Sequence, residues 1–243
     1  MNAALRWVWL GTVPYRDAWS LQQRLAAARR GGAIDDVVLL LEHPPVYTVG
    51  RNSDARHLGE GADSLIAAGA ECLDVDRGGS VTFHGPGQLV AYPIVRLAEV
   101  FPIHGHSAHG DVHRYLRALE HALIATASAF GVRAQRRPPY TGVWSGNRKL
   151  AAIGVKLAGG VTTHGLAINI RNDLTWFDRI VPCGIEGAGV ASLQALGARS
   201  LTPETVAPLL AMRLAAAFNE QLFEADGVTT ALVTSHLDAT VAA

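Results

Sequence analysis

The stretch from residue 142 to residue 170 constrains the fold most, because short strand-like segments alternate in it with two-residue turns. The turns are Gly146-Asn147 and Gly159-Gly160, and the segments that they separate are Gly142–Ser145, Lys149–Lys156 and Val161–Ile170. Turns of this length and composition join antiparallel neighbours in a sheet. We therefore predict a meander of three strands, with Lys149 at the mouth of the middle strand.

Strand-like segments also occur outside this meander. Asp36–Glu42 holds a continuous apolar run, which is typical of a strand buried on both faces. Shorter strands are expected at Trp7–Val13, Val46–Gly50, Cys72–Asp76, Leu89–Val95 and from Val132 to Arg136. The histidine-rich segment Pro102–His109 is expected to be a loop, and Trp176–Cys183 to lead into a turn around the cysteine.

Four segments have helical periodicity, namely Asp17–Arg30, Asp63–Ala70, Asp111–Phe130 and Thr202–Phe223. Asp111 and Thr202 are suitable N-caps, whereas Pro208 predicts a kink or a later start of the last helix. Periodicity is weak from Asp226 onward, so we expect residues 226–243 to be a loosely packed tail. The irregular order of strands and helices indicates an α+β fold, and residues 1–243 are expected to form a single domain.

Composition excludes several functional classes. The formal net charge is zero, so the chain as a whole has no attraction for nucleic acid or an anionic membrane. Cys72 and Cys183 make neither a disulfide framework nor a zinc motif, and they are expected to be reduced thiols in the cytoplasm. The N-terminus does not have the pattern of a signal peptide, and no apolar run reaches the ~20 residues of a membrane span.

Two residues stand out chemically. Lys149 is one of only two lysines in a chain that uses arginine almost throughout, and an ammonium can lose its proton where a guanidinium cannot. Cys183 lies in a Pro-Cys-Gly turn rather than in an apolar run. An ammonium within ~4–6 Å of a thiol favours the thiolate. We therefore hypothesise that Lys149 and Cys183 form an acyl-transfer dyad, with His84 and His164 as alternative bases; an inert thiol and a solvated strand end are the simpler alternatives.

The glycine-rich segment from Arg77 to Gln88 is a candidate binding element. Its glycines would let backbone lie close against a ligand, although a Gly-Gly turn between two strands explains them equally well. The three histidines at 104, 106 and 109 make a metal site conceivable, but the nearby Asp111 is better explained as a helix cap. His43, next to Pro44-Pro45, is expected to be a turn residue.

Five sequence blocks in order, between about residue 38 and residue 193, resemble the lipoyl(octanoyl) transferases, which are the octanoyltransferases of lipoate biosynthesis. The blocks are Leu41–Arg51, Arg77–Pro93, Lys149–Val155, His164–Ala167 and Val181–Ile185. Phe83 stands where the family frequently has Tyr, and the aromatic ring is kept.

The resemblance implies a mixed sheet with packed helices, similar to the catalytic domain of biotin protein ligases and lipoate-protein ligases. It implies transfer of an octanoyl group from acyl carrier protein through a thioester on Cys183, with Lys149 lowering the pKa of the thiol. It implies substrate-binding roles for Arg77, Gly78, Gly79, Ser80, Val81, Thr82, Phe83, His84, Ala152, Ile153, Gly154, Gly165, Leu166 and Ala167. No metal, nucleotide or other cofactor is implied.

The partners expected from this resemblance are octanoyl-acyl carrier protein as donor, and lipoyl domains of 2-oxoacid dehydrogenase complexes and the glycine cleavage H protein as acceptors. A monomer is expected. The acidic carrier would dock on local arginines, for which Arg51, Arg77, Arg148 and the group Arg133, Arg136 and Arg137 are candidates. Rival hypotheses are an ATP-dependent ligase of the same fold, an amidotransferase between lipoyl domains, and a non-catalytic module that binds the acyl carrier.

Overall fold

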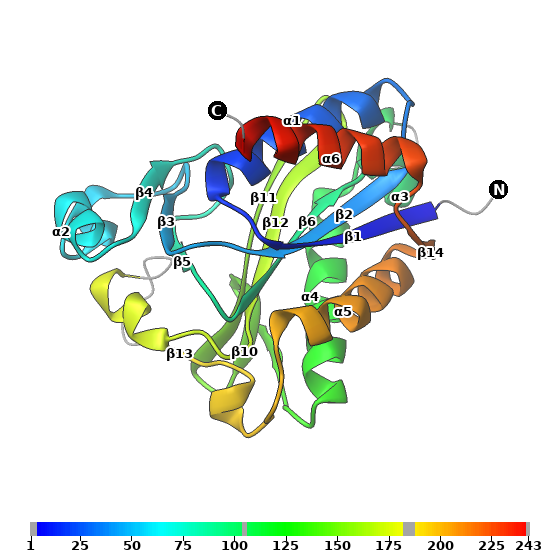
Figure 1. Ribbon diagram of the computed structural model, residues 1–243. Coiled ribbons are helices and arrows are strands. Elements are labelled where there is room, and N and C mark those ends of the chain that lie inside the picture. The colour runs from blue at the N-terminus through cyan, green and yellow to red at the C-terminus, as the bar shows by residue number, and fades with distance from the viewer. Residues whose placement is uncertain (1–3, 104–105, 182–187, 242–243) are drawn as a thin grey trace.

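A computed structural model describes residues 4–103, 106–181 and 188–241, and a large mixed sheet covered by helices forms its centre (Figure 1). Within the described residues this sheet has nine strands. In spatial order they are β14 (Gln221–Glu224), β1 (Ala4–Thr12), β2 (Asp36–Glu42), β6 (Gln88–Ile94), β12 (Val161–Asn169), β11 (Arg148–Ala158), β10 (Tyr140–Ser145) and β9 (Gln135–Arg137), with β13 (Gly189–Val190) paired to β11. The predicted meander is confirmed as the antiparallel run β10, β11 and β12.

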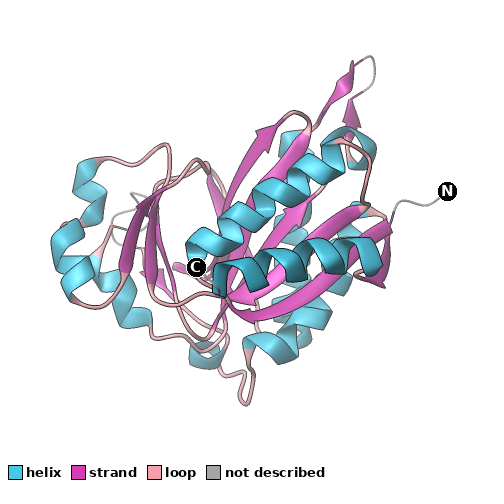
Figure 2. Ribbon diagram, turned by 45° about the horizontal axis from the view of Figure 1, so that its top comes forward, coloured by secondary structure: helices cyan, strands magenta, loops and turns pink. Residues whose placement is uncertain are grey.

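Helices cover both faces of the large sheet. On one face α1 (Tyr15–Arg30) contacts β12 and β6, and α6 (Gly227–Val241) packs on α1. On the other face α4 (Val112–Ala129) and α5 (Pro203–Phe218) lie against each other and against the sheet, as Figures 1 and 2 show. Each face is therefore buried under its own apolar core, and β2, buried along most of its length, contributes to both.

A second, three-stranded sheet stands at one end of the large sheet (Figure 2). Its strands are β4 (Glu71–Asp74), β3 (Val46–Val49) and β5 (Val81–His84), and short helices pack around it, namely η1 (Ala55–Leu58), α2 (Ala62–Ala67) and η2 (Leu174–Arg179). Its apolar core includes Tyr47 and Phe83, and the Phe83 ring stacks on Trp176 with 5.1 Å between ring centroids. This small sheet matters for function because β5 faces the large sheet across a pocket.

Three expectations about secondary structure are wrong. The segment Pro102–His109 contains paired strands, β7 (Pro102–Ile103) and β8 (His106–Gly110), with α3 (Leu97–Val100) before them. Helix α5 starts at Pro203, so a later start at Pro208 is wrong, because Thr202 caps the helix by accepting from the Thr205 amide at 3.2 Å. The alternative, a kink at Pro208, stays a prediction. The helix also stops at Phe218 rather than Phe223, because Asn219 adopts a left-handed conformation with φ 58° and the chain then joins the sheet as β14.

The expected loose tail is instead the helix α6. Asp226 caps its start by accepting from the Thr229 amide at 2.8 Å. Val233 and His236 are buried against α1, and the His236 ring hydrogen-bonds the Asp17 carbonyl at 3.0 Å. Tertiary packing of this kind stabilises a helix whose own periodicity is weak. Across the described helices, none has the length and apolar character needed to span a membrane.

Candidate active site

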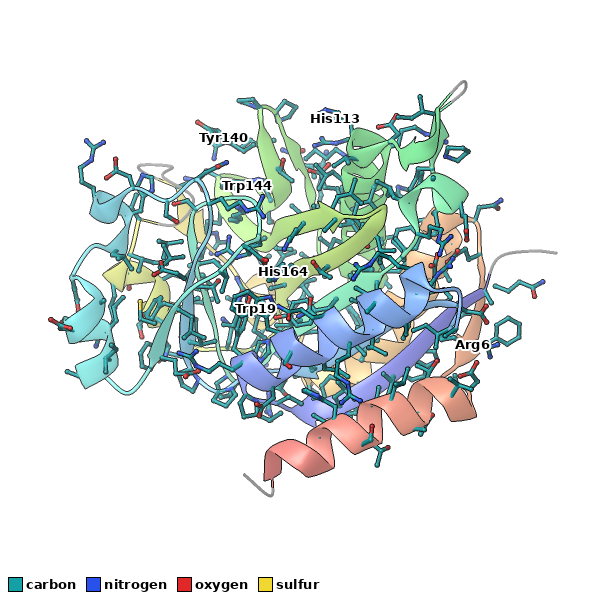
Figure 3. The ribbon with its side chains drawn as sticks, turned by 90° about the horizontal axis from the view of Figure 1, so that it is seen from above. Arg6, Trp19, His113, Tyr140, Trp144 and His164 are labelled. Carbon is teal, nitrogen blue, oxygen red and sulfur yellow. The ribbon has the colours of Figure 1, made fainter. Side chains whose placement is uncertain are left out.

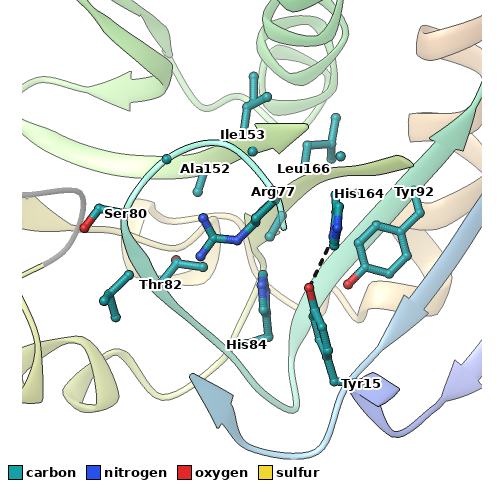
Figure 4. Close-up of a pocket in the computed structure, with 15 residues that line it drawn as sticks. Tyr15, Arg77, Ser80, Thr82, His84, Tyr92, Ala152, Ile153, His164 and Leu166 are labelled. Carbon is teal, nitrogen blue, oxygen red and sulfur yellow. Dashed lines mark hydrogen bonds between the residues drawn. The ribbon is translucent and has the colours of Figure 1, made fainter. Parts of the chain in front are cut away.

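A pocket lies between the small sheet and the large sheet and collects segments that are far apart in the sequence (Figure 4). It has a volume of about 450 Å³ including its open mouth. Most of the residues expected to bind substrate line it, namely Arg77, Gly79, Ser80, Val81, Thr82, His84, Ala152, Ile153, Gly154, Gly165, Leu166 and Ala167. The fold thus brings the glycine-rich segment, the middle of β11 and the middle of β12 around one cavity.

Two of the expected substrate-binding residues do not line this pocket. The Gly78 amide donates to the Val155 carbonyl at 2.9 Å, so Gly78 fastens the glycine-rich segment to β11. Phe83 alternates with Thr82 and His84 along β5, and its ring therefore points into the core of the small sheet. The other face of β5 carries the polar residues that meet the pocket.

Two glycines permit the close approach of backbone around the pocket. A Cβ at Gly154 would lie 2.8 Å from the Gly78 carbonyl oxygen and 3.1 Å from Cδ of Arg77. A Cβ at Gly165, which pairs with Gly154 across the sheet, would lie 2.1 Å from the Ala91 carbonyl oxygen. Side chains at these positions would push the glycine-rich segment off β11 and separate β12 from β6.

Arg77 is a buried cation in the pocket wall. Its side chain donates to the Thr48 carbonyl at 2.6 Å, to the Thr48 hydroxyl at 2.8 Å and to the Gly78 carbonyl at 3.0 Å. Arg77 is only 7% exposed, so the expectation that it docks a partner protein is wrong. These bonds instead hold the guanidinium in a fixed position beside the cavity.

Lys149 is placed by an irregularity of the sheet. Ala151 pairs with Val143 and Lys149 pairs with Trp144, so β11 has one extra residue, Leu150, between the two pairs. Such a bulge re-aims the neighbouring side chain. Lys149 is 8% exposed, and its Nζ lies 5.6 Å from the centroid of the Trp144 ring. Figure 3 shows Trp144 near Tyr140 of the same strand, and the two ring centroids are 6.3 Å apart.

Lys149 also lines a second cavity that adjoins the pocket. Thr82, Ala152 and Ala167 line both cavities, so the space beside Lys149 is a direct neighbour of the pocket described above. On its other edge Lys149 pairs in parallel with Val190 of β13, and its carbonyl accepts from the Ala191 amide at 2.9 Å. The lysine therefore lines a cavity that is adjacent to the pocket.

The structure describes only one of the two cysteines, Cys72. Cys183 lies outside the described residues, which resume at Ala188, just before β13. Cys72 is half-buried on β4 and packs against the core of the small sheet, as expected for a small apolar residue. Burial raises the pKa of the Cys72 thiol, so little of it is thiolate at neutral pH.

His84 and His164 are buried in the pocket wall. Burial lowers the pKa of His84 to about 3 and also lowers that of His164, whose ring nitrogen Nε2 contacts Asp76 Oδ1 at 2.7 Å. Both imidazoles are therefore neutral at pH 7. A base with a pKa near 3 accepts protons poorly at neutrality, so His84 is a weaker candidate for the base than the sequence alone indicates.

Four residues that are not among the predicted substrate-binding residues complete the site. Tyr15, from the start of α1, and Tyr92, from β6, line the pocket. Gln88 and Asn169 line the cavity beside Lys149 and bond to each other at 2.9 Å, and Asn169 also donates to the Ala191 carbonyl at 2.9 Å. Nothing in local spacing identifies the two tyrosines, because they reach the pocket only through packing of α1 on the sheet.

The structure describes only part of the histidine-rich segment. His104 lies outside the described residues, and His106 and His109 belong to β8. Among the side chains that the structure describes, no three His, Cys, Asp or Glu groups gather as they would around a metal ion.

Comparison with known proteins identifies relatives of this chain. Residues 14–215 match the family described as the lipoyl protein ligase A/B catalytic domain. The chain is 52% identical over 186 residues to an octanoyltransferase of Rubrobacter xylanophilus, covering 76% of this chain and 80% of that one. It is 45% identical over 233 residues to an octanoyltransferase of Roseiflexus sp., covering 95% of this chain and 93% of the relative.

Solved ligase structures share the fold. A lipoate-protein ligase A bound with ATP has a TM-score of 0.70 at 14% identity, covering 98% of this chain and 95% of that one. A biotin protein ligase of Aquifex aeolicus, in complex with biotin and ATP, has a TM-score of 0.51 at 13% identity, covering 88% of this chain and 70% of the ligase. At these identities the likeness concerns the fold alone, and it confirms the predicted mixed sheet with packed helices.

Proposed function

The chain belongs to the octanoyltransferase family, built on the lipoyl protein ligase A/B catalytic domain, and from this premise we propose that it moves an octanoyl group from acyl carrier protein to a lipoyl-domain lysine. In this proposal the octanoyl group passes through a thioester on Cys183, and Lys149 carries the protons. The acceptors are lipoyl domains of 2-oxoacid dehydrogenase complexes and of the glycine cleavage H protein.

One observation supports the proposal: the cavity beside Lys149 adjoins the pocket and shares lining residues with it. Thr82, Ala152 and Ala167 belong to the lining of both. In this proposal a chain held in the pocket presents its carbonyl end toward the adjoining cavity that Lys149 lines. Alanine, glycine, isoleucine and leucine residues of β11 and β12 line much of the pocket, which suits a hydrocarbon chain because such a chain binds by leaving water.

Each proposed step conserves atoms and protons. The Cys183 thiolate attacks the thioester carbonyl, the bond between that carbonyl and the carrier sulfur breaks, and the carrier thiolate takes a proton from Lys149. The acceptor amine then attacks the new thioester, the carbonyl–Sγ bond breaks, and the neutral Lys149 takes the proton released by the amine. The dyad thus returns to thiolate and ammonium.

Connectivity supports the role given to Cys183. Val190 pairs with Lys149, and Cys183 precedes Val190 by seven positions in the sequence. Cys72, the other thiol of the chain, is packed in the small sheet, and its pKa is raised by burial. Of the two thiols, Cys183 is therefore the one that lies close in sequence to the strand paired with Lys149.

The test is the intact mass of the protein after mixing with octanoyl-acyl carrier protein in the absence of acceptor. We expect an adduct of one octanoyl group that hydroxylamine removes, because donor and intermediate are both thioesters and the intermediate accumulates without an amine. Cys72→Ala should keep the adduct, and Cys183→Ala should lose it.

An adduct on Cys72, or none at all, would contradict the dyad. Modification of a lipoyl domain from free octanoate and ATP, with no turnover of the thioester donor, would identify an ATP-dependent ligase instead. Use of an octanoyl lipoyl domain as the preferred donor would identify an amidotransferase.

A further inference from the structure

We propose that Glu120 of α4 is a positioning residue for Lys149: its buried carboxylate holds the backbone of Gly142, and Gly142 in turn confines the lysine side chain. Glu120 is not among the described residues that line the two cavities, so its effect on the site passes through Gly142. The inference rests on the proposed function for what Lys149 does, and on the structure alone for where Lys149 lies.

Glu120 is a carboxylate placed inside the molecule, where its side chain is fully buried. Its helix, α4, contacts β10 and β11, and Figure 3 shows the helix that carries His113 beside the strand that carries Tyr140 and Trp144. Apolar side chains of similar volume often stabilise a core as well as a buried ion pair does. A carboxylate at this position therefore calls for a role other than stability, and the contacts of its two oxygens indicate which.

The two oxygens of this carboxylate have different partners. Oε1 accepts from the Gly142 amide at 3.1 Å. Oε2 lies 2.9 Å from Nη1 of Arg117 and 2.8 Å from Nε of Arg136, in ion-pair contacts rather than aligned hydrogen bonds. Both arginines are exposed, so they neutralise the carboxylate from the solvent side while Oε1 is directed to the sheet.

The regular ladder does not fix Gly142 on the side of β9. The two strands pair at Tyr140 and again at Trp144, but between these pairs three residues of β10 face one residue of β9, Arg136. Extra residues of this kind disrupt the ladder locally. Glu120 spans the interruption, with one oxygen on Gly142 and the other on Arg136. The carboxylate thus takes the place of a strand partner for Gly142.

Gly142 confines Lys149 because its backbone lies directly against the end of the lysine side chain. A Cβ at Gly142 would lie 2.9 Å from Cε of Lys149 and 3.6 Å from Nζ. A shift of Gly142 would therefore either press on the side chain or open space beside it. The hydrogen bond from Gly142 to Glu120 opposes such a shift, and in this way Glu120 helps to direct the ammonium to the cavity that Lys149 lines.

The lysine content of the chain allows Lys149 to be observed directly. Lys149 and Lys156 are its only lysines, so protein labelled with carbon-13 at lysine Cε gives a separate NMR signal for each, and Lys156→Arg assigns them. Nζ of Lys149 lies 5.6 Å from the centroid of the Trp144 ring. Because an aromatic ring shifts the resonances of nuclei near its face, the Lys149 signal reports the position of the side chain. Lys156, paired with Asp76, is the internal control.

Two mild variants separate the hydrogen bond from the charge. Glu120→Gln keeps an oxygen that accepts from the Gly142 amide and loses the charge. Glu120→Asp keeps the charge but is one methylene shorter, so its oxygens withdraw from Gly142. We expect Glu120→Gln to keep the Lys149 signal and near-normal octanoyl transfer. Glu120→Asp should move the Lys149 signal toward that of an unfolded chain and lower transfer roughly 10–100-fold, the range expected for a displacement of about 1 Å.

Arg117→Gln is the matched control, because it removes one ion-pair partner of Glu120 and leaves the bond to Gly142 in place. It should keep the Lys149 signal, and the Lys156 signal should stay unchanged in every variant. An unmoved Lys149 signal in Glu120→Asp would overturn the inference. Displacement of that signal in Glu120→Gln would also overturn it, by assigning the effect to charge, and this outcome decides the question if Glu120→Asp does not fold.

The same variants separate this inference from the proposed function. The acyl-enzyme formed from octanoyl-acyl carrier protein is measured by intact mass beside the NMR signals. A displaced Lys149 signal in Glu120→Asp, without any acyl-enzyme in the wild-type protein, supports the positioning role and contradicts acyl transfer. An octanoyl-enzyme in the wild-type protein, together with an unmoved Lys149 signal in Glu120→Asp, supports transfer and contradicts the positioning role.

Discussion

Lys149 combines two properties that arginine cannot combine, a positive charge and a removable proton. Lys149→Arg keeps the charge, so the Cys183 thiolate should persist and react with an alkylating agent at mildly acidic pH. The guanidinium stays protonated near neutrality, so transfer should fall by roughly 10²–10⁴-fold, the usual contribution of general acid–base catalysis. Lys149→Ala should lose both alkylation at low pH and transfer. Rates of octanoyl transfer and of alkylation, measured on the same variants, test this directly.

Near-normal transfer by Lys149→Arg would limit Lys149 to an electrostatic role. The base would then have to be sought elsewhere, and His164 would be a better candidate than His84, whose pKa burial lowers to about 3.

Gly142 positions Lys149. Its backbone has φ 127°, and a Cβ there would lie 2.7 Å from the Ala151 carbonyl oxygen and 2.9 Å from Cε of Lys149. Gly142→Ala should therefore move the lysine and lower transfer by at least tenfold, with a loss of about 1–3 kcal/mol in the free energy of unfolding. Gly31→Ala is the control, because its φ is −74° and its added Cβ would touch nothing closer than 3.6 Å. Normal transfer by Gly142→Ala would show that the lysine tolerates displacement.

Sequence alone identified most residues that line the pocket, because the motifs that carry the resemblance lie on the strands that form it. Tyr15 and Tyr92 could not be predicted from the sequence, for a physical reason. Tyr15 and His164 are 149 positions apart and meet only when α1 packs on β12. Docking on Arg77 is a wrong prediction because the burial of this side chain depends on Thr48, a residue on another strand that local sequence does not indicate.

At the scale of elements, turn chemistry was the reliable signal. The two-residue turns Gly146-Asn147 and Gly159-Gly160 specify hairpins by their backbone conformation, and the meander has the predicted order. The segments that were wrong, β7 to β8, β14 and α6, are those whose structure depends on partners distant in sequence. β14 exists because it pairs with β1 at the opposite end of the chain.

The junction of α5 and β14 should make stability depend on pH. Burial and the neighbouring Asp36 carboxylate raise the pKa of Glu220 to about 8. In the unfolded chain a glutamate ionises near pH ~4.3, so between these values the folded state holds a proton that the unfolded state has released. The free energy of unfolding should therefore fall as the pH rises from about 4.5 to 8.

Glu220→Gln removes the ionisable group and should flatten this part of the pH profile. At pH 8 the variant should be more stable than the wild-type protein by about 1 kcal/mol, as measured by urea unfolding. Glu224→Gln, at an exposed position of β14, should leave the profile unchanged. A Glu220→Gln profile as steep as that of the wild-type protein would assign the pH dependence to another group.

At the scale of the whole molecule, the site depends on two sheets meeting. The small sheet supplies Thr82 and His84, the large sheet supplies Lys149 and the walls from β11 and β12, and α1 supplies Tyr15. Helices and strands of both sheets contribute to one cavity. The single-domain organisation itself stays a prediction. With a net charge of zero, any attraction for an acidic carrier must come from exposed arginines such as Arg51 and Arg148.

The bulge at the start of β11 has a consequence for inheritance. Leu150 is the extra residue between the pairs Lys149–Trp144 and Ala151–Val143, so its presence sets the register of everything before it on that strand. Side chains alternate between the two faces with each residue, and an in-frame loss of the single codon for Leu150 would turn Lys149 to the opposite face. The position of the Lys149 side chain therefore depends on the number of codons in this segment of the gene. A deletion of one codon would remove Lys149 from the site even though every other residue is unchanged.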